Sequence, residues 1–286
     1  MDPPHQPPKF LLGVLEPTIS GTTPISIFAG DEGLSPSPTS PQEDRPFVTL
    51  TFAQSLDAKI AGVGGKQLAL SGKESMVMTH WMRTMHDAIL VGVGTALNDN
   101  PQLNTRHLPP LPGGSDIKYS LPRPIVLDTN LRSSAESKLL GNYRRGVGRR
   151  PWIIASAPEG SSGAATSWNE KKLALEQAGA KVVNVQSSEG RISIPHFLKT
   201  LRELGIRSLM VEGGADVIRS FLAAASPSTI SSPAVDAIIV TVAPMFVGDA
   251  GVGYGRGLRT DQLPKLGLGK SEVFGRDSVI AMKVLS

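Results

Sequence analysis

Three short segments carry side chains that could bind a nucleotide cofactor and transfer protons. They span residues 55–61, 91–101 and 211–215, and each lies where a predicted strand ends. In an open α/β sheet, ligands bind in the crevice beyond the strand ends. The spacing therefore indicates an enzyme that uses a nucleotide cofactor, rather than an α/β domain without a ligand.

The turn Glu212-Gly213-Gly214 joins a predicted strand to a predicted helix. Its backbone N–H groups would lie at a helix N-terminus, which attracts an anion, and glycine allows a ligand to approach the backbone closely. A tight turn without a ligand explains the glycines equally well. The carboxylate of Glu212 at a strand end favours the functional interpretation.

Five further polar residues are weaker candidates. Thr95 could donate to a phosphate and Asp99 could bind a ribose hydroxyl, although their loop is also rich in ordinary turn residues. Lys59 follows the first predicted strand and could hold a phosphate or a developing oxyanion. A solvated surface position is the simpler interpretation of Lys59, Arg83 and Arg106 taken one at a time.

Composition excludes several classes of site. The 286 residues are 40% hydrophobic, which suffices for one large domain with a core. Cysteine is absent, so disulfides, thiolate zinc sites and cysteine nucleophiles are excluded. The five histidines have no metal-ligand spacing, so no metal is expected. With no long apolar run and no leader pattern, we expect a cytoplasmic protein without a membrane partner.

The charge balance suits a small anionic ligand. The formal net charge is +4, and the densest basic run, residues 144–150, contains no aromatic residue. A nucleic-acid-binding surface usually combines basic and aromatic residues. We therefore interpret this run as a solvated loop and expect no nucleic-acid partner.

The elements that must position these residues alternate between strand and helix. Strands are predicted over residues 47–53, 88–93, 124–128, 152–155, 181–185, 208–211, 235–242 and 278–284. Helices are predicted near residues 72–86, 168–179, 194–205 and 215–224, the first with a capping box formed by Ser71 and Glu74.

This alternation predicts an α/β fold, with a mostly parallel sheet and helices on both faces. No helix separates the last two predicted strands, so the C-terminal part should be antiparallel. A single domain is expected over residues 46–286. Residues 1–45 are rich in Pro, Ser, Thr and Gly and are predicted to form a disordered tail.

Taken in order, five motifs resemble the riboflavin-biosynthesis reductase family. They are residues 55–61, Arg83 with residues 87–90, residues 94–106, residues 125–128 and residues 212–214. The resemblance covers about residues 46–284 and implies a dihydrofolate-reductase-like fold. It implies NADPH-dependent reduction of the ribosylamino side chain of 2,5-diamino-6-ribosylamino-4(3H)-pyrimidinone 5′-phosphate to a ribitylamino group.

The resemblance also implies a stand-alone form of the reductase. Bacterial members can be fused to a zinc deaminase that needs cysteine ligands, and this chain has none. Long segments at residues 109–122 and 225–233 suggest a eukaryotic, fungal form. A homodimer is implied as well.

The resemblance assigns the candidate site residue by residue. The catalytic candidates are Lys59 and Glu212, which would hold the sugar hydroxyls and assist proton delivery. The substrate side comprises Ser71, Arg83, Leu103, Arg106 and Glu212, with the two arginines as a clamp for the phosphate. The cofactor side comprises Ala61, Thr95, Asp99, Leu127, Asp128, Thr129, Asn130, Gly213, Gly214, Ala215 and Asp216. Apart from the resemblance, the position of Arg132 just past residues 127–130 makes it our candidate for the 2′-phosphate of NADPH.

Three alternatives remain open from the sequence. The substrate could be the deaminated pyrimidine phosphate. The enzyme could instead be a dihydrofolate-reductase-like protein that reduces a pteridine. A basic, non-catalytic nucleic-acid-binding domain is a third possibility, of a different class.

Overall fold

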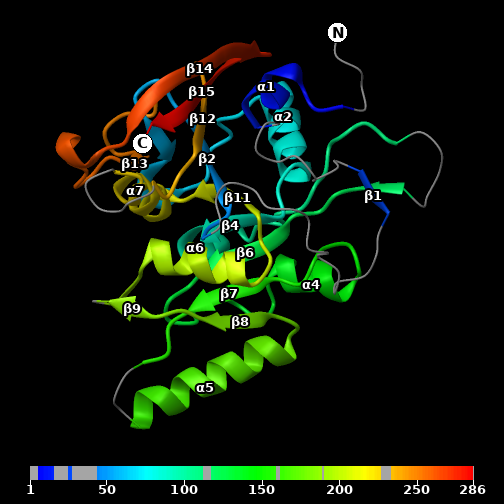
Figure 1. Cartoon of the computed structure of the whole chain (residues 1–286), viewed down its shortest axis with the longest axis vertical. Helices are drawn as coiled ribbons and strands as arrows, with labels where there is room; N and C mark the ends of the chain where they lie inside the picture. The colour runs from blue at the N-terminus through cyan, green and yellow to red at the C-terminus, as the bar shows by residue number, and fades with distance from the viewer. Residues whose placement is uncertain are drawn as a thin grey trace.

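The computed structural model describes residues 6–15, 25–27, 44–111, 117–158, 162–188, 190–226 and 233–285. Its centre is a nine-stranded sheet (Figure 1). In spatial order the strands are β14 (Lys265–Phe274), β15 (Asp277–Leu285), β12 (Ala237–Val242), β2 (Phe47–Gln54), β11 (Ser208–Gly213), β4 (Ala88–Gly92), β6 (Arg123–Leu127), β7 (Trp152–Ala155) and β8 (Lys181–Asn184). Neighbours from β12 to β8 are parallel, whereas β15 and β14 are antiparallel, which confirms the predicted sheet.

Helices and short strands complete the described part of the chain. The helices are α1 (Lys9–Leu15), α2 (Lys73–Thr84), α3 (Val93–Asp99), α4 (Lys138–Arg144), α5 (Ser162–Gln177), α6 (Ile194–Glu203) and α7 (Ala215–Ala224), with 3₁₀ turns at Val63–Gly65 and Thr260–Gln262. Three strand pairs lie outside the main sheet: β1 (Ile25–Ile27) with β5 (Ile117–Tyr119), β9 (Ser187–Ser188) with β10 (Arg191–Ile192), and β3 (Lys59–Ala61) with β13 (Val252–Gly253).

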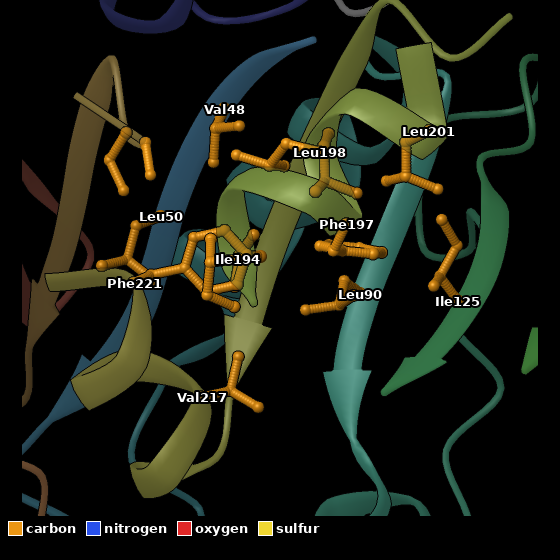
Figure 2. Close-up of a cluster of buried hydrophobic side chains, with 14 of the residues drawn as sticks. Val48, Leu50, Leu90, Ile125, Ile194, Phe197, Leu198, Leu201, Val217 and Phe221 are labelled. Carbon is orange, nitrogen blue, oxygen red and sulfur yellow. The ribbon is translucent and has the colours of Figure 1, made fainter. Parts of the chain in front are cut away.

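The parallel strands bury both faces, because successive side chains of a strand point to opposite sides. Leu90 of β4 belongs to a cluster that includes Phe197 of α6 and Phe221 of α7 (Figure 2). Its neighbour Ile89 lies in the other cluster, with Met82 of α2. The sheet is thus covered on both faces, as predicted.

Part of the segment predicted to be a disordered tail is ordered. In α1, the side chains of Phe10, Leu11, Val14 and Leu15 are at most 5% exposed, and Phe10 packs edge-to-face on Phe274 at 5.6 Å. Their spacing places all four on one face of a helix. The tail prediction is therefore wrong for Lys9–Leu15, where a short apolar face outweighs the proline-rich surroundings, and also for Ile25–Ile27, which pairs with β5.

The predicted capping box of α2 is wrong. The N-cap residue is Gly72, and no side chain of the helix's own first turn caps it. Instead, Asp277 of β15 accepts a hydrogen bond from the backbone N–H of Gly72 at 2.6 Å and another from the hydroxyl of Ser75. A carboxylate more than 200 residues away in the chain replaces the local cap, which no local pattern could reveal.

The residues after β4, predicted to be a polar loop, form helix α3 instead. Ala96 and Leu97 favour helix over turn, and the helix ends at Asn100, which adopts a left-handed conformation with φ 42°. Only the stretch from Asn100 onward is the loop that the sequence predicted.

Candidate active site

Several of the predicted site segments meet at one edge of the sheet. β2, β11, β4 and β6 are consecutive parallel neighbours, so their carboxyl ends lie together. Gly213 ends β11, Gly92 ends β4 and Leu127 ends β6. The segments that the sequence singled out are thereby brought side by side.

Arg83 of α2 and Glu212 of β11 form a forked ion pair at this edge. Nε and Nη2 of Arg83 donate to Oε1 of Glu212 at 3.0 and 2.8 Å, and Nη2 also donates to Oε2 at 3.0 Å. The side chains are only 11% and 19% exposed. Nη1 of Arg83 donates to the backbone oxygen of Asn104 at 3.0 Å, which ties α2 to the loop that carries Arg106.

Arg106 lies within electrostatic reach of both members of this pair. Burial lowers the pKa of its guanidinium and the charge of Arg83 lowers it further, whereas the carboxylate of Glu212 opposes the shift. Its Nε–H is buried and has no hydrogen-bond partner among the described residues. Two guanidinium groups and one carboxylate leave a net positive charge suited to an anion. We call Arg83, Glu212 and the loop 100–107 the arginine side.

Two predicted substrate residues do not join this group. The side chain of Leu103 is 2% exposed and belongs to the hydrophobic core, so it anchors the loop and offers no surface to a ligand. Ser71 precedes α2, whereas Arg83 lies in its last turn. At 1.5 Å per residue, about 15 Å of helix separates the two ends, and the neighbouring Gly72 is bound to Asp277.

Lys59 is the first residue of β3, directly after the turn that follows β2, the strand that borders β11 on the side away from β4. Its backbone N–H donates to Oγ of Ser55 at 3.0 Å, and its carbonyl accepts from the N–H of Ser55 at 2.9 Å. Ala58 closes the turn in a left-handed conformation with φ 56°. Within the described residues, the Lys59 ammonium has no hydrogen bond or ion pair, so its protons remain available to a ligand.

Asp57 fixes this turn to the loop that follows β12. Its carboxylate accepts from the hydroxyl of Ser55 at 2.5 Å and from the backbone N–H groups of Val247 and Gly248 at 3.1 and 2.7 Å. The hydrogen bond from Ser55 contributes most to lowering the pKa of Asp57 to about 2, the backbone donors add to it, and burial opposes it. We call residues 55–59 and the loop 245–253 the lysine side.

Between these two sides, the start of α7 is open to an anion. Gly214 is its N-cap residue, and no side chain caps the helix. Gly213 has φ +109°, a conformation that residues with a Cβ rarely adopt, and a Cβ on Gly214 would lie 3.0 Å from Oγ1 of Thr95. The first amides of α7, at Ala215 and Asp216, therefore have the geometry of a phosphate cradle, with the Thr95 hydroxyl beside them.

The other predicted cofactor residues differ in what they expose. Asp128 is fully buried and its Oδ2 accepts from both the N–H and the hydroxyl of Ser133 at 2.7 Å, so this side chain holds its own loop. Burial raises the pKa of Asp99 at the end of α3. Ala61, Leu127 and Thr129 are half-buried, and Asn130, Arg132 and Asp216 are exposed.

Sequence reasoning missed three residues that shape the site. They are Asp57, Asn104 and the buried His80, whose Nδ1 accepts the backbone N–H of Arg106 at 3.0 Å. For His80 a signal existed, because it stands three positions before Arg83 and shares its helix face. For Asp57 and Asn104 the decisive contacts join segments far apart in the sequence.

The described residues contain neither a metal site nor a membrane-spanning helix. No group of three or more His, Asp or Glu side chains there is arranged to hold a metal ion. Nor does any helix in those ranges combine the length and apolarity needed to cross a bilayer.

Comparisons with known proteins identify relatives over most of the chain. Residues 46–280 match the family model described as the RibD C-terminal domain. The chain is 37% identical over 216 residues to the 2,5-diamino-6-ribosylamino-4(3H)-pyrimidinone 5′-phosphate reductase of Debaryomyces hansenii, covering 74% of this chain and 80% of that one. It is 32% identical over 208 residues to the reductase of that name from Saccharomyces cerevisiae, covering 72% and 75%. The solved structure of the Saccharomyces cerevisiae riboflavin biosynthesis reductase superposes with a TM-score of 0.61 at 27% identity, covering 87% of this chain and 93% of that one.

Proposed function

Because the chain belongs to the RibD C-terminal domain family and is a reductase of riboflavin biosynthesis, we propose that it reduces 2,5-diamino-6-ribosylamino-4(3H)-pyrimidinone 5′-phosphate with NADPH. Relatives named for this reaction are matched over 75% or more of their length. The observation that carries the proposal is the cluster of Arg83, Glu212 and Arg106 beside the open start of α7.

The cofactor would lie across the ends of β11, β4 and β6. The uncapped amides at Ala215 and Asp216 suit its pyrophosphate, and the missing side chains of Gly213 and Gly214 allow close approach. Thr95 can donate a further hydrogen bond. Arg132, exposed after β6, is the proposed contact of the 2′-phosphate. NADPH, when bound, supplies the hydride that reduces the substrate.

Arg106 is the principal ligand proposed for the 5′-phosphate of the substrate. A guanidinium has five N–H donors, and Arg83 already directs four N–H···O contacts to Glu212 and Asn104. Arg106 is less engaged, and its buried Nε–H lacks a partner among the described residues. The predicted two-arginine clamp thus becomes an Arg106 site, with Arg83 mainly holding Glu212 in place.

The chain's ionisable residues would manage the proton. In the reduction, the bond between C1′ and the ring oxygen of the ribose breaks, C1′ receives a hydride and that oxygen receives a proton. Glu212 is paired with a guanidinium, so it would accept hydrogen bonds from sugar hydroxyls rather than donate a proton. Lys59, whose ammonium is uncommitted, is the proposed proton donor to the departing ring oxygen.

The deciding experiment is a spectrophotometric assay of NADPH oxidation. Purified protein is incubated with NADPH and the diamino substrate, in parallel with its deaminated analogue and with dihydrofolate. Substrate-dependent oxidation with the diamino compound alone supports the proposal. Oxidation with only the deaminated compound would move the enzyme to the next step, and oxidation with only dihydrofolate would replace the assignment.

We propose in addition that the protein is a homodimer in the cytoplasm. The homodimer rests on the family resemblance, and the compartment rests on the sequence expectation. Light scattering coupled to size exclusion would give the mass to compare with the 30.2 kDa of one chain, and cell fractionation would test the compartment.

A further inference from the structure

The loop 100–107, which carries Arg106, is held in an unusual backbone conformation. Asn100, Leu103 and His107 all have left-handed φ angles, of 42°, 47° and 58°. Residues with a Cβ adopt such angles rarely and at a cost. The loop therefore needs contacts from outside itself to keep this shape and to aim Arg106.

Helix α2 supplies two such contacts from one face. Nη1 of Arg83 donates to the backbone oxygen of Asn104 at 3.0 Å, and Nδ1 of His80 accepts the backbone N–H of Arg106 at 3.0 Å. His80 and Arg83 are three positions apart, so they lie on the same face of the helix. Together they hold the loop by hydrogen bonds to the backbone of the two residues that flank Thr105.

The ring of His80 is built to remain a neutral acceptor. It is 3% exposed, and the ring of His107 packs against it edge-on at 5.1 Å. Burial lowers the pKa of His80 to about 3, and the charges of Arg83, Arg106 and His107 add to this, while the backbone of Asn104 opposes it. At neutral pH the ring therefore carries one proton and keeps one nitrogen free to accept.

We propose that His80 is a positioning residue for the reaction: by accepting the backbone N–H of Arg106, it fixes the direction of the Arg106 guanidinium toward the substrate phosphate. His80 touches neither substrate nor cofactor in this role and acts through Arg106. The inference rests on the proposed function only for the identity of the ligand that Arg106 binds.

Kinetics separate this role from a general loss of structure. In His80→Leu the acceptor is lost, and we expect the KM for the pyrimidine phosphate to rise about tenfold, as for the loss of one hydrogen bond, with the KM for NADPH and kcat changed less than about twofold. In His80→Asn the side-chain oxygen stands near the place of Nδ1, so the KM should recover. Adding His80→Leu to Arg106→Ala should raise the KM no further, because non-additivity marks residues that act as one unit.

The chain offers a matched control in His86. This histidine is also buried, and its ring bonds to the carbonyl of Met82 at 2.8 Å and to the hydroxyl of Thr49 at 2.9 Å, away from the loop. His86→Leu should lower the melting temperature without a selective change in the KM for the pyrimidine phosphate. An equal selective change in His86→Leu would overturn the proposal.

Amide hydrogen exchange at Arg106 provides a readout that does not depend on activity. Its N–H should be protected in the wild type and in His80→Asn, and exchange faster in His80→Leu. Unchanged protection in His80→Leu, or no recovery of the KM in His80→Asn, would overturn the proposal. If His80→Leu does not fold, His80→Gln, which displaces the acceptor by one methylene, takes its place. If the wild type is inactive with the pyrimidine phosphate, the proposed function is refuted. The exchange data still test whether His80 holds the backbone of Arg106.

Discussion

The arginine side and the lysine side of the site differ in how their charged groups are paired. On the arginine side, Arg83 and Glu212 are largely buried and pair with each other, which leaves Arg106 as the charge available to a ligand. On the lysine side, the carboxylate of Asp57 accepts hydrogen bonds from two backbone amides and one hydroxyl. The ammonium of Lys59 has no partner in the described part of the chain. The arginine side therefore contains a complete ion pair beside the unpartnered Nε–H of Arg106, whereas the ammonium on the lysine side has no counter-ion among the described residues.

The difference indicates a division of labour. Charges that are already paired and desolvated lose little freedom when a ligand binds, so they suit orientation. An uncommitted ammonium can lend a proton without first breaking an ion pair, so it suits proton transfer. Substitutions should accordingly affect binding and stability on the arginine side, and turnover on the lysine side.

The largest effect is expected for Lys59→Met, which keeps the length of the side chain and removes its charge. If Lys59 donates the proton, kcat should fall by about 10²- to 10⁴-fold, with stability changed by less than about 0.5 kcal/mol because no partner is left behind. Steady-state kinetics and urea unfolding give the two quantities. Full turnover in this variant would remove Lys59 from the mechanism.

A smaller loss of activity, but a larger loss of stability, is expected for Glu212→Ala. It leaves the buried guanidinium of Arg83 without its counter-ion, which costs about 2–3 kcal/mol, below the range for fully buried pairs because this pair is partly exposed. We expect kcat/KM to fall about 100-fold, in keeping with the loss of a positioning group. The matched control is Asp261→Ala, which breaks the exposed pair with Arg259 and should change stability by less than about 0.5 kcal/mol. Equal losses in both variants would erase the contrast between buried and exposed pairs.

For Asp57→Asn, about a tenfold fall in kcat is expected. The amide oxygen of Asn accepts hydrogen bonds more weakly than a carboxylate, so the contact with Val247 and Gly248 loosens. Ser55, which bonds to both residue 57 and Lys59, then shifts and displaces Lys59. Small displacements of a catalytic group lower the rate of reaction. The KM for the pyrimidine phosphate should stay within about twofold, because Arg106 lies on the other side of the site. A rise in that KM without a change in kcat would show that the two sides do not act separately.

The sequence predicted the sheet well because its signals are local. The apolar runs of β2, β4 and β12 and the glycines after β11 reveal strands and their ends without knowledge of the neighbours. β14 was missed because glycine interrupts it at Gly267 and Gly269, and it is a strand only through its pairing with β15. α1 was missed because the helix is short and its apolar face is buried by distant residues such as Phe274.

The sequence predicts where the site lies in the fold, but only in part which of its side chains face a ligand. Motifs at strand ends correctly bring Arg83, Arg106 and Glu212 together. Whether a side chain faces the ligand or the core depends on distant residues, and the burial of the Asp128 and Leu103 side chains could not be predicted from their motifs. His80 shows the same limit from the other direction, because its function depends on an amide 26 residues away in the chain.

The smallest effect, and the sharpest test of the contrast, is the order in which acid loosens the two sides. The ring of His80 stays neutral in the fold, because its pKa is lowered from 6.5 to about 3. As the pH falls, the unfolded chain therefore binds a proton at His80 before the folded chain does. The contribution of His80 to stability is lost as the pH drops from about 6.5 to 3. Asp57 has its pKa lowered from 3.8 to about 2, so its contribution to stability persists above pH 4 and is lost only between about pH 4 and 2.

Protection of the amides in loop 100–107 should therefore decline at a higher pH than protection of the amides of Val247 and Gly248. Hydrogen exchange, corrected for its intrinsic pH dependence, measures both. His86, whose pKa burial lowers to about 4, destabilises the whole fold over an overlapping range, so the prediction concerns the difference between the loops. Simultaneous loss of protection in both loops would mean that they open as one unit.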